Sequence, residues 1–257
     1  MRQLIAAGLM LIAAGCGTTG HEPASYAPQS GVDTSAQTRA RIHTELAAGY
    51  YELGNYGVSL QEAAEALKSD SNYAPALNVL GLVYMELRDD KAAETSFQRA
   101  LRVSPLDSDT NNNYGWFLCQ RKREQESIKY FLAALRNPLY TTPDKSWVNA
   151  GLCARQAGDL NTAEEYFQKA LKVRPTQPQA LFHMADMAYQ RKNYPEAKVY
   201  LARLLRDIEP TAATLWLALR VERGLGDRDA EASLGFQLRK NFPDSREARA
   251  LIAGRYE

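Results

Sequence analysis

Small, aromatic and charged residues recur along this chain with a period that fits α-helices. Two blocks share one pattern, in which a small residue, an aromatic residue, a second small residue and a proline stand at spacings of four, three and five. Apolar residues three and four positions apart lie on one helix face, and proline cannot continue a helix. No segment shows strand-like alternation, so the chain is predicted to be a series of helices and turns. The blocks are Ala93, Phe97, Ala100 and Pro105, and Ala163, Phe167, Ala170 and Pro175.

A glycine flanked by aliphatic residues precedes each block at the same offset, Gly81 in one case and Gly151 in the other. Small residues let two helices approach closely, and the aromatic residue fills the gap that they leave. The combined pattern resembles the tetratricopeptide repeat, a helix–turn–helix of about 34 residues. This resemblance implies an all-α fold, in which helix pairs stack into a right-handed superhelix, an α-solenoid, with a concave side.

Six such units fit the sequence, with Thr142 and Pro143 as an insertion and a degenerate sixth unit that turns at Gly226-Asp227. After them, apolar residues at helical spacing suit a capping helix, which covers the open face of the last unit. The expected units are residues 40–73, 74–107, 108–141, 144–177, 178–211 and 212–245, within a repeat region of 38–245, and the capping helix is 246–257.

The N-terminus has the pattern of a secretory signal, because a positive Arg2 is followed by a short apolar run and small residues. Residues 1–15 are therefore predicted to be a signal peptide. The residues before Cys16 resemble a bacterial lipobox, which implies lipidation of Cys16 at the outer membrane; the alternative is a plain signal peptide with an incidental cysteine. Residues 16–37 are rich in Gly, Thr, Ser and Pro and are predicted to form a flexible tether.

Charge and motif content argue against several classes of function. The formal net charge is +1 without a basic patch, so we expect no nucleic-acid partner. His21, His43 and His183 have no partners at metal-ligand spacing, and no phosphate-binding glycine-rich loop or nucleophile elbow is present. We therefore predict a non-enzymatic protein without a metal, a cofactor or a small-molecule substrate.

Two cysteines, Cys119 and Cys153, fall on the first helices of the adjacent units three and four. Their side chains are placed to approach across the contact between these helices, and an oxidising compartment favours a disulfide. Closing a loop of roughly 35 residues would stabilise the fold by about 3–4 kcal/mol. The alternative is that both are buried free thiols, since free cysteine is often buried.

The concave side is the expected binding site. In this repeat the second, fifth, ninth and twelfth positions of each first helix face the groove, and here they mix apolar, amide and charged side chains. Such a surface suits an amphipathic helix or an extended peptide, although some of these residues are alternatively expected to pack only between first helices. The candidate groove residues are Tyr51, Asn78, Leu82, Met85, Asn112, Trp116, Val148, Arg155, Phe182 and Tyr189, and the same row includes Leu152, Asp186, Trp216 and Arg220.

Three stretches go beyond the generic repeat: residues 112–119 (Asn-Asn-Tyr-Gly-Trp-Phe-Leu-Cys), 149–153 and 215–220. They resemble the type IV pilus biogenesis lipoproteins of the PilW/PilF kind. The resemblance implies a pilotin on the periplasmic face of the outer membrane, which helps the pilus secretin reach that membrane and assemble into its multimer. Members of this family can carry a cysteine pair at the positions of Cys119 and Cys153.

Two other readings compete with a pilus role. One is a lipoprotein scaffold of another cell-envelope assembly machine, which would differ from a pilotin only in its partner. The other is an envelope enzyme or its regulatory subunit, which lacks any constellation of residues to support it.

Overall fold

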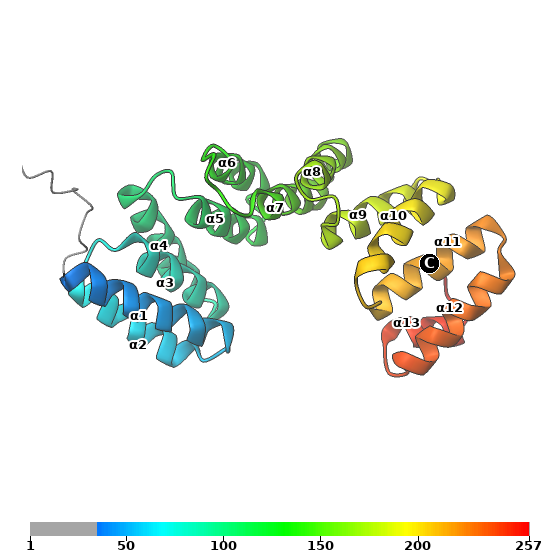
Figure 1. Cartoon of the computed structure of the whole chain (residues 1–257), viewed down its shortest axis with the longest axis horizontal. Helices are drawn as coiled ribbons and strands as arrows, with labels where there is room; N and C mark the ends of the chain where they lie inside the picture. The colour runs from blue at the N-terminus through cyan, green and yellow to red at the C-terminus, as the bar shows by residue number, and fades with distance from the viewer. Residues whose placement is uncertain (1–34, 257) are drawn as a thin grey trace, which may run out of the picture. The chain divides into compact units, whose positions relative to one another are not determined.

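The computed structural model describes residues 35–256, and within them the chain forms thirteen α-helices and no β-strand (Figure 1). The helices are α1 (Ser35–Glu52), α2 (Tyr56–Ser69), α3 (Ala74–Glu86), α4 (Asp90–Val103), α5 (Ser108–Gln120), α6 (Glu124–Ala134), α7 (Pro143–Gln156), α8 (Leu160–Val173), α9 (Pro178–Gln190), α10 (Tyr194–Asp207), α11 (Ala212–Leu225), α12 (Arg228–Asn241) and α13 (Arg246–Ile252). The predicted signal peptide, Cys16 and most of the predicted tether lie outside the described residues. None of the thirteen helices is long and apolar enough to cross a membrane.

Consecutive helices pack in six pairs, from α1 with α2 to α11 with α12, and α13 packs against the last pair. Each second helix also contacts the first helix of the next unit. First helices also lie beside their counterparts in neighbouring units, with the backbones of α7 and α9 less closely packed than those of the other such pairs. The predicted all-α array of six helix pairs with a C-terminal capping helix is therefore confirmed.

The helix ends differ from the predicted boundaries at three places. Helix α1 begins at Ser35, so the last residues of the predicted tether and repeat boundary already belong to it. Ala36 and Arg39 are good helix formers and extend the helix toward the N-terminus. Ala40 is its first buried residue. Helix α7 begins at Pro143 rather than after it, because proline is accommodated at the first helical position. The capping helix stops at Ile252.

The turns inside the pairs are closed by short polar side chains. Asp89, Asp159 and Asp227 each stand just before a second helix and accept a hydrogen bond from a backbone N–H of its first turn, at 3.0 Å in every case. Asn193 does the same before α10. An N-cap residue of this kind satisfies a backbone donor that the helix itself leaves unpaired. These residues therefore fix where each second helix begins.

Glycine and an aromatic ring interlock within units two to four. A Cβ atom added at Gly81 would lie 2.5 Å from a ring carbon of Phe97, and one added at Gly151 would lie 2.7 Å from the ring of Phe167. A Cβ atom at Gly115 would lie 2.9 Å from the Phe131 ring in the same way. All three phenylalanine rings are fully buried. The repeated sequence pattern thus encodes a close approach of two helices that a larger residue would block.

The degenerate unit six reverses this arrangement. At the glycine position of the first helix it carries Leu219, and at the aromatic position of the second helix it carries Gly235. A Cβ atom at Gly235 would lie 3.5 Å from a methyl group of Leu219 and 3.3 Å from one of Leu251. The bulk has moved from one helix to the other, so the pair still packs although the sequence motif is lost.

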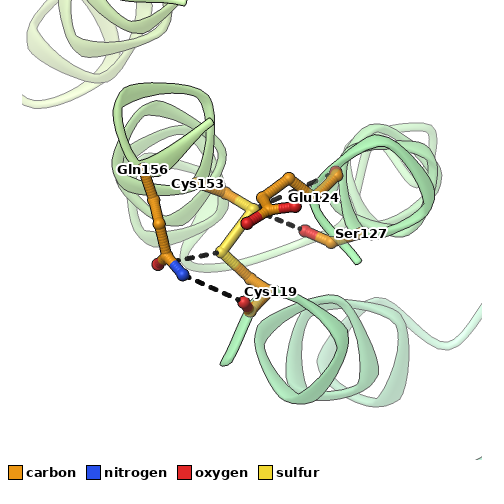
Figure 2. Close-up of a disulfide and its surroundings, with 5 residues drawn as sticks. All are labelled: Cys119, Glu124, Ser127, Cys153 and Gln156. Atoms are coloured by element: carbon orange, nitrogen blue, oxygen red, sulfur yellow. Dashed lines mark hydrogen bonds between the residues drawn. A yellow bond between two sulfur atoms is a disulfide. The ribbon is translucent and has the colours of Figure 1, made fainter. Parts of the chain in front are cut away.

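The predicted disulfide is present between Cys119 on α5 and Cys153 on α7, with a Cα–Cα distance of 5.8 Å (Figure 2). Both residues are buried. The Ser127 hydroxyl donates to the Cys153 sulfur at 3.0 Å, and the Gln156 amide donates to the Cys119 carbonyl at 3.4 Å. The bond links the first helices of units three and four in the core of the array.

Candidate protein-binding groove

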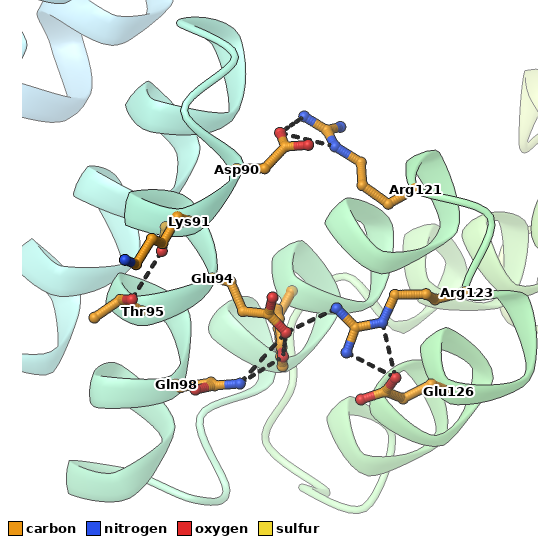
Figure 3. Close-up of polar contacts among 9 residues, drawn as sticks. Asp90, Lys91, Glu94, Thr95, Gln98, Arg121, Arg123 and Glu126 are labelled. Carbon is orange, nitrogen blue, oxygen red and sulfur yellow. Dashed lines mark hydrogen bonds and ion pairs between the residues drawn. The ribbon is translucent and has the colours of Figure 1, made fainter.

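A polar network joins units two and three through α4, α5 and the start of α6 (Figure 3). The Glu94 carboxylate on α4 accepts hydrogen bonds from the Tyr114 hydroxyl at 2.9 Å and from Arg123 at 2.8 Å. Asp90 pairs with Arg121 at the other end of the same interface. Burial raises the pKa of the Tyr114 hydroxyl well above its usual range, so this group remains a proton donor. The network joins α4 to α5 and to the start of α6, and α5 carries the amide side chains of the next set.

An amide ladder runs across the first helices α3, α5 and α7. The Asn113 amide donates to the Asn78 side-chain oxygen at 3.1 Å, which joins units two and three. The Asn112 oxygen accepts from Ser146 at 2.9 Å and from Asn149 at 3.0 Å, which joins units three and four. The predicted groove residues Asn78 and Asn112 therefore belong to one half-buried polar row. Their neighbours in the row, including Asn113, were not among the predicted groove residues.

Two predicted groove residues, Met85 and Trp116, meet at a small cavity of about 220 Å³. This N-terminal cavity has a polar rim, to which Arg121 contributes from the network described above. The cavity lies at the C-terminal ends of the first helices of units two and three. Its remaining lining residues are Glu86, Arg88 and Gln120.

A larger cavity, of about 560 Å³, lies among α7, α9, α11 and α13. We call it the C-terminal cavity. Most of its lining side chains occupy the ninth, twelfth, fifth or second positions of three successive first helices. It brings together the predicted Arg155 and Phe182. The full lining is Leu152, Arg155, Gln156, Phe182, His183, Asp186, Ala213, Trp216, Arg220, Arg246 and Glu247.

One wall of the C-terminal cavity is a fixed polar cluster. Arg155 pairs with Asp186 and donates to the Nδ1 atom of His183 at 2.8 Å. Because arginine only donates, a neutral His183 carries its proton on Nε2. Burial and the neighbouring Arg155 lower the pKa of His183 to about 4, so the ring is neutral at pH 7. Phe167 stacks on the same ring at a centroid distance of 5.2 Å.

The other predicted groove residues have different surroundings. Tyr51 is half-buried beside Tyr56 and lines neither cavity, and Leu82 packs partly buried against the cluster that contains Phe97. Tyr189 lies against the guanidinium of Arg220, at 4.6 Å from ring centroid to carbon.

Val148 was expected to face the groove, and this prediction is wrong. Its side chain is fully buried in the core cluster that contains Cys119 and Cys153. Trp116 packs against the same cluster. A short aliphatic side chain at this position reaches only the contact between first helices, so it contributes to packing and not to a binding surface.

The C-terminal cavity also contains residues that the groove positions did not predict. Gln156, His183, Arg246 and Glu247 line it from outside the expected row. His183 follows Phe182 on the same helix, and its role becomes visible only when Arg155 of the preceding unit is placed beside it. Arg246 and Glu247 depend on how α13 folds back onto α11 and α12, which no repeat pattern specifies. Among the described residues, no group of three His, Cys, Asp or Glu side chains is placed to hold a metal ion.

Six stacked helix pairs, each built from about 34 residues, define the class of the protein. Families described as tetratricopeptide repeats match residues 44–105, 79–138 and 154–219. Among curated relatives, the type IV pilus assembly protein PilF of Pseudomonas aeruginosa is 31% identical over 205 residues, which cover 80% of this chain and 81% of PilF.

Two solved structures agree with this match. The crystal structure of PilW, described as a widely conserved type IV pilus biogenesis factor, has a TM-score of 0.75 and 32% identity and covers 83% of this chain and 98% of its own. A structure of Pseudomonas aeruginosa PilF has a TM-score of 0.78 and 29% identity, with 86% and 100% covered. The chain belongs to the PilF and PilW family of type IV pilus biogenesis proteins, whose tetratricopeptide repeats mediate protein–protein interaction.

Proposed function

We propose that this protein is a pilotin: a non-enzymatic outer-membrane lipoprotein that binds the type IV pilus secretin and promotes its localisation and multimerisation. The observation that carries the proposal is the family match to PilF and PilW over most of the chain. The two cavities and the amide ladder support it, because they place apolar, amide and charged groups along the first helices, where a helix or an extended segment of the secretin would lie.

A lipid anchor would link secretin binding to secretin assembly at the outer membrane. Acylation of Cys16 would hold the protein at the periplasmic face of the outer membrane, since each buried acyl methylene contributes about 0.8 kcal/mol. A secretin subunit captured there would have a high local concentration next to other captured subunits. Multimerisation would then be favoured without any chemical step. Replacing Cys16 by Ser should release the protein from the membrane fraction and abolish incorporation of labelled palmitate, and retention of both in the variant would contradict the anchor.

Deletion of the gene tests the pilotin role. We expect the deletion strain to lose heat-resistant secretin multimers and surface pili while secretin monomer is still made, and the wild-type gene to restore both. A strain complemented with the Cys16→Ser variant should form multimers in the wrong membrane or in reduced amount. Normal multimers and pili in the deletion strain would reject the pilotin role and would favour a scaffold for another envelope assembly machine.

A further inference from the structure

One charged side chain in the C-terminal cavity has no charged partner. Arg220 lies on α11, with its guanidinium carbon 4.6 Å from the ring centroid of Tyr189 and 5.5 Å from that of Trp216. Its Nε atom is buried and has no hydrogen-bond partner. Within residues 35–256, its contacts are with these two rings, and no carboxylate reaches it.

The other charged groups that line the cavity are paired. Arg155 is bound to Asp186, and Arg246 is bound to Glu247 at 2.9 Å. Their charges cancel, so Arg220 leaves the lining with one uncompensated positive charge. Arg220 is only partly buried, but burying its Nε–H group without an acceptor is unfavourable. The lining of the cavity therefore carries a net positive charge, which a bound anion would compensate.

The surroundings of Arg220 favour a planar anion. Aromatic rings interact with a guanidinium through its face and leave its N–H groups, which lie in the plane, to donate at the edge. A carboxylate accepts two parallel hydrogen bonds from such an edge. Stacking against Tyr189 and Trp216 restricts the side chain in advance, so less conformational entropy is lost when the anion binds.

A further cavity, of about 230 Å³, adjoins the C-terminal cavity and shares Phe182, His183 and Ala213 with it. Leu204 and Ile208 line its interior, so its character is apolar. An anion-binding site beside an apolar one matches a polypeptide segment in which an acidic side chain stands next to a bulky apolar side chain. A free inorganic anion would leave the apolar cavity empty.

We propose that the C-terminal cavity binds an acidic side chain of a partner polypeptide through Arg220, with the apolar neighbour of that side chain entering the adjoining cavity. This inference rests on the proposed function only in taking the partner to be a polypeptide. It assigns the ligand class, a carboxylate flanked by apolar residues, to a site formed by units four to six and α13.

Two capped peptides test the proposal with the purified full chain: acetyl-Gly-Phe-Glu-Leu-Gly-amide and the same peptide with Gln in place of Glu. Calorimetric or NMR titration gives the dissociation constant of each. We expect the Glu peptide to bind about tenfold more tightly than the Gln peptide, as a charge-assisted hydrogen bond does relative to a neutral one. The preference should weaken as salt is raised.

Three variants locate the preference. Arg220→Gln should bind both peptides equally, and Arg220→Lys, which keeps the charge but loses the planar edge, should keep part of the preference. Arg239→Gln removes an exposed arginine from the second helix of the same unit and should leave the tenfold preference unchanged. Circular dichroism tests whether each variant is folded. If Arg220→Gln does not fold, Arg220→Lys becomes the deciding variant.

Several results would overturn the proposal. Absence of binding by the Glu peptide, equal affinity of the two peptides, or a full preference retained in Arg220→Gln would each do so. Inorganic phosphate that binds in an Arg220-dependent way, while the Glu peptide does not, would show a simple anion site instead. Because this assay needs no secretin, a negative result alongside lost multimers in the deletion strain would reject only this inference, and a positive result with normal multimers would reject only the pilotin role.

Discussion

The junction of units three and four and the C-terminal cavity treat their polar side chains in opposite ways. At the junction, Cys119 and Cys153 are joined, and the Asn112 oxygen accepts two hydrogen bonds from the next unit. In the C-terminal cavity, Arg220 lies against the rings of Tyr189 and Trp216 and has no counter-charge among the described residues. The Asn112 side-chain oxygen thus finds its partners within the chain, whereas the Arg220 Nε atom has none among the described residues. Departures from internal consistency are expected at functional sites rather than at structural ones.

The repeat motif shows the same contrast. Units two to four keep the glycine–aromatic pair, in which a ring fills the space that a missing side chain leaves. Unit six loses the motif and keeps only the summed bulk, with Leu219 and Gly235 exchanged. Packing therefore constrains these positions in the regular units, whereas the first helix of unit six carries Trp216 and Arg220, which line the C-terminal cavity.

The largest expected effect is on the junction. Reducing the disulfide, whose cysteines are 34 residues apart, should lower the free energy of unfolding by about 3–4 kcal/mol, because the unfolded chain regains loop entropy. Urea unfolding with and without reductant measures the change, and the Cys119→Ala, Cys153→Ala double variant should no longer respond to reductant. Two free thiols detected by alkylation in the unreduced, unfolded protein would contradict the assignment.

The next effect concerns pH and belongs to the C-terminal cavity. The folded pKa of His183 is lowered to about 4, below that of an unfolded histidine, so between these values the unfolded chain binds the extra proton. Stability is therefore present above the unfolded pKa and is lost as the pH falls. Between pH 7 and pH 4.5 this group should cost about 2–3 kcal/mol. His183→Gln keeps an acceptor for Arg155 and should remove that part of the pH dependence in urea unfolding. If the free energy of unfolding of the variant depends on pH as it does in the wild type, the assignment to His183 is wrong.

Filling the glycine of a regular unit should have a smaller effect. Gly81→Ala places a Cβ atom 2.5 Å from the Phe97 ring, so the ring must shift. Overpacking partly offset by better helix propensity predicts a loss of about 1–2 kcal/mol in the free energy of unfolding.

Two glycines serve as controls for that substitution. Gly49→Ala on α1 meets no atom within 4 Å and should stabilise by about 0.5–1 kcal/mol. Gly235→Ala in unit six meets flexible leucine methyl groups and should be close to neutral. If Gly81→Ala instead stabilises the protein as Gly49→Ala does, the proposed close packing of the helices in the regular units would be contradicted.

The smallest expected effect is on binding alone. Trp116→Ala or Tyr51→Ala should weaken secretin binding by about tenfold, because a large aromatic contact is lost, while the helical circular-dichroism signal is kept. Tyr51 lines neither cavity, so an effect of Trp116→Ala without one of Tyr51→Ala would restrict the groove to units two to six. If binding survives both changes, the N-terminal part of the groove is misplaced.

Much of the fold could be predicted from the sequence because each unit repeats one packing problem. Glycine and phenylalanine at fixed spacing predict the close approach of two helices, and the helix positions of Cys119 and Cys153 predict their contact. The start of α1 could not be predicted, because the motif begins only with the residues that pack against α2. Val148 was assigned to the groove by its position, but side-chain length decides whether a residue reaches the surface or stays between helices.

The candidate site was harder to predict because it depends on contacts between units. First-helix positions placed Arg155, Phe182, Trp216 and Arg220 on one side, and the structure brings all four to one cavity. Which arginine is paired is a property of the assembled array: Arg155 meets Asp186 of the next unit, and the described chain offers no carboxylate to Arg220. Such pairing has no signature within a single repeat.

The central claim is that the protein acts by binding a secretin along the first helices of its repeats. The most direct measurement is the amount of heat-resistant secretin multimer in a deletion strain that carries the wild-type gene, the Trp116→Ala, Arg220→Gln double variant, or no gene. We predict multimers with the wild type and as few with the folded, membrane-bound double variant as with no gene. Full multimer levels without any gene, or with the double variant, would contradict the claim.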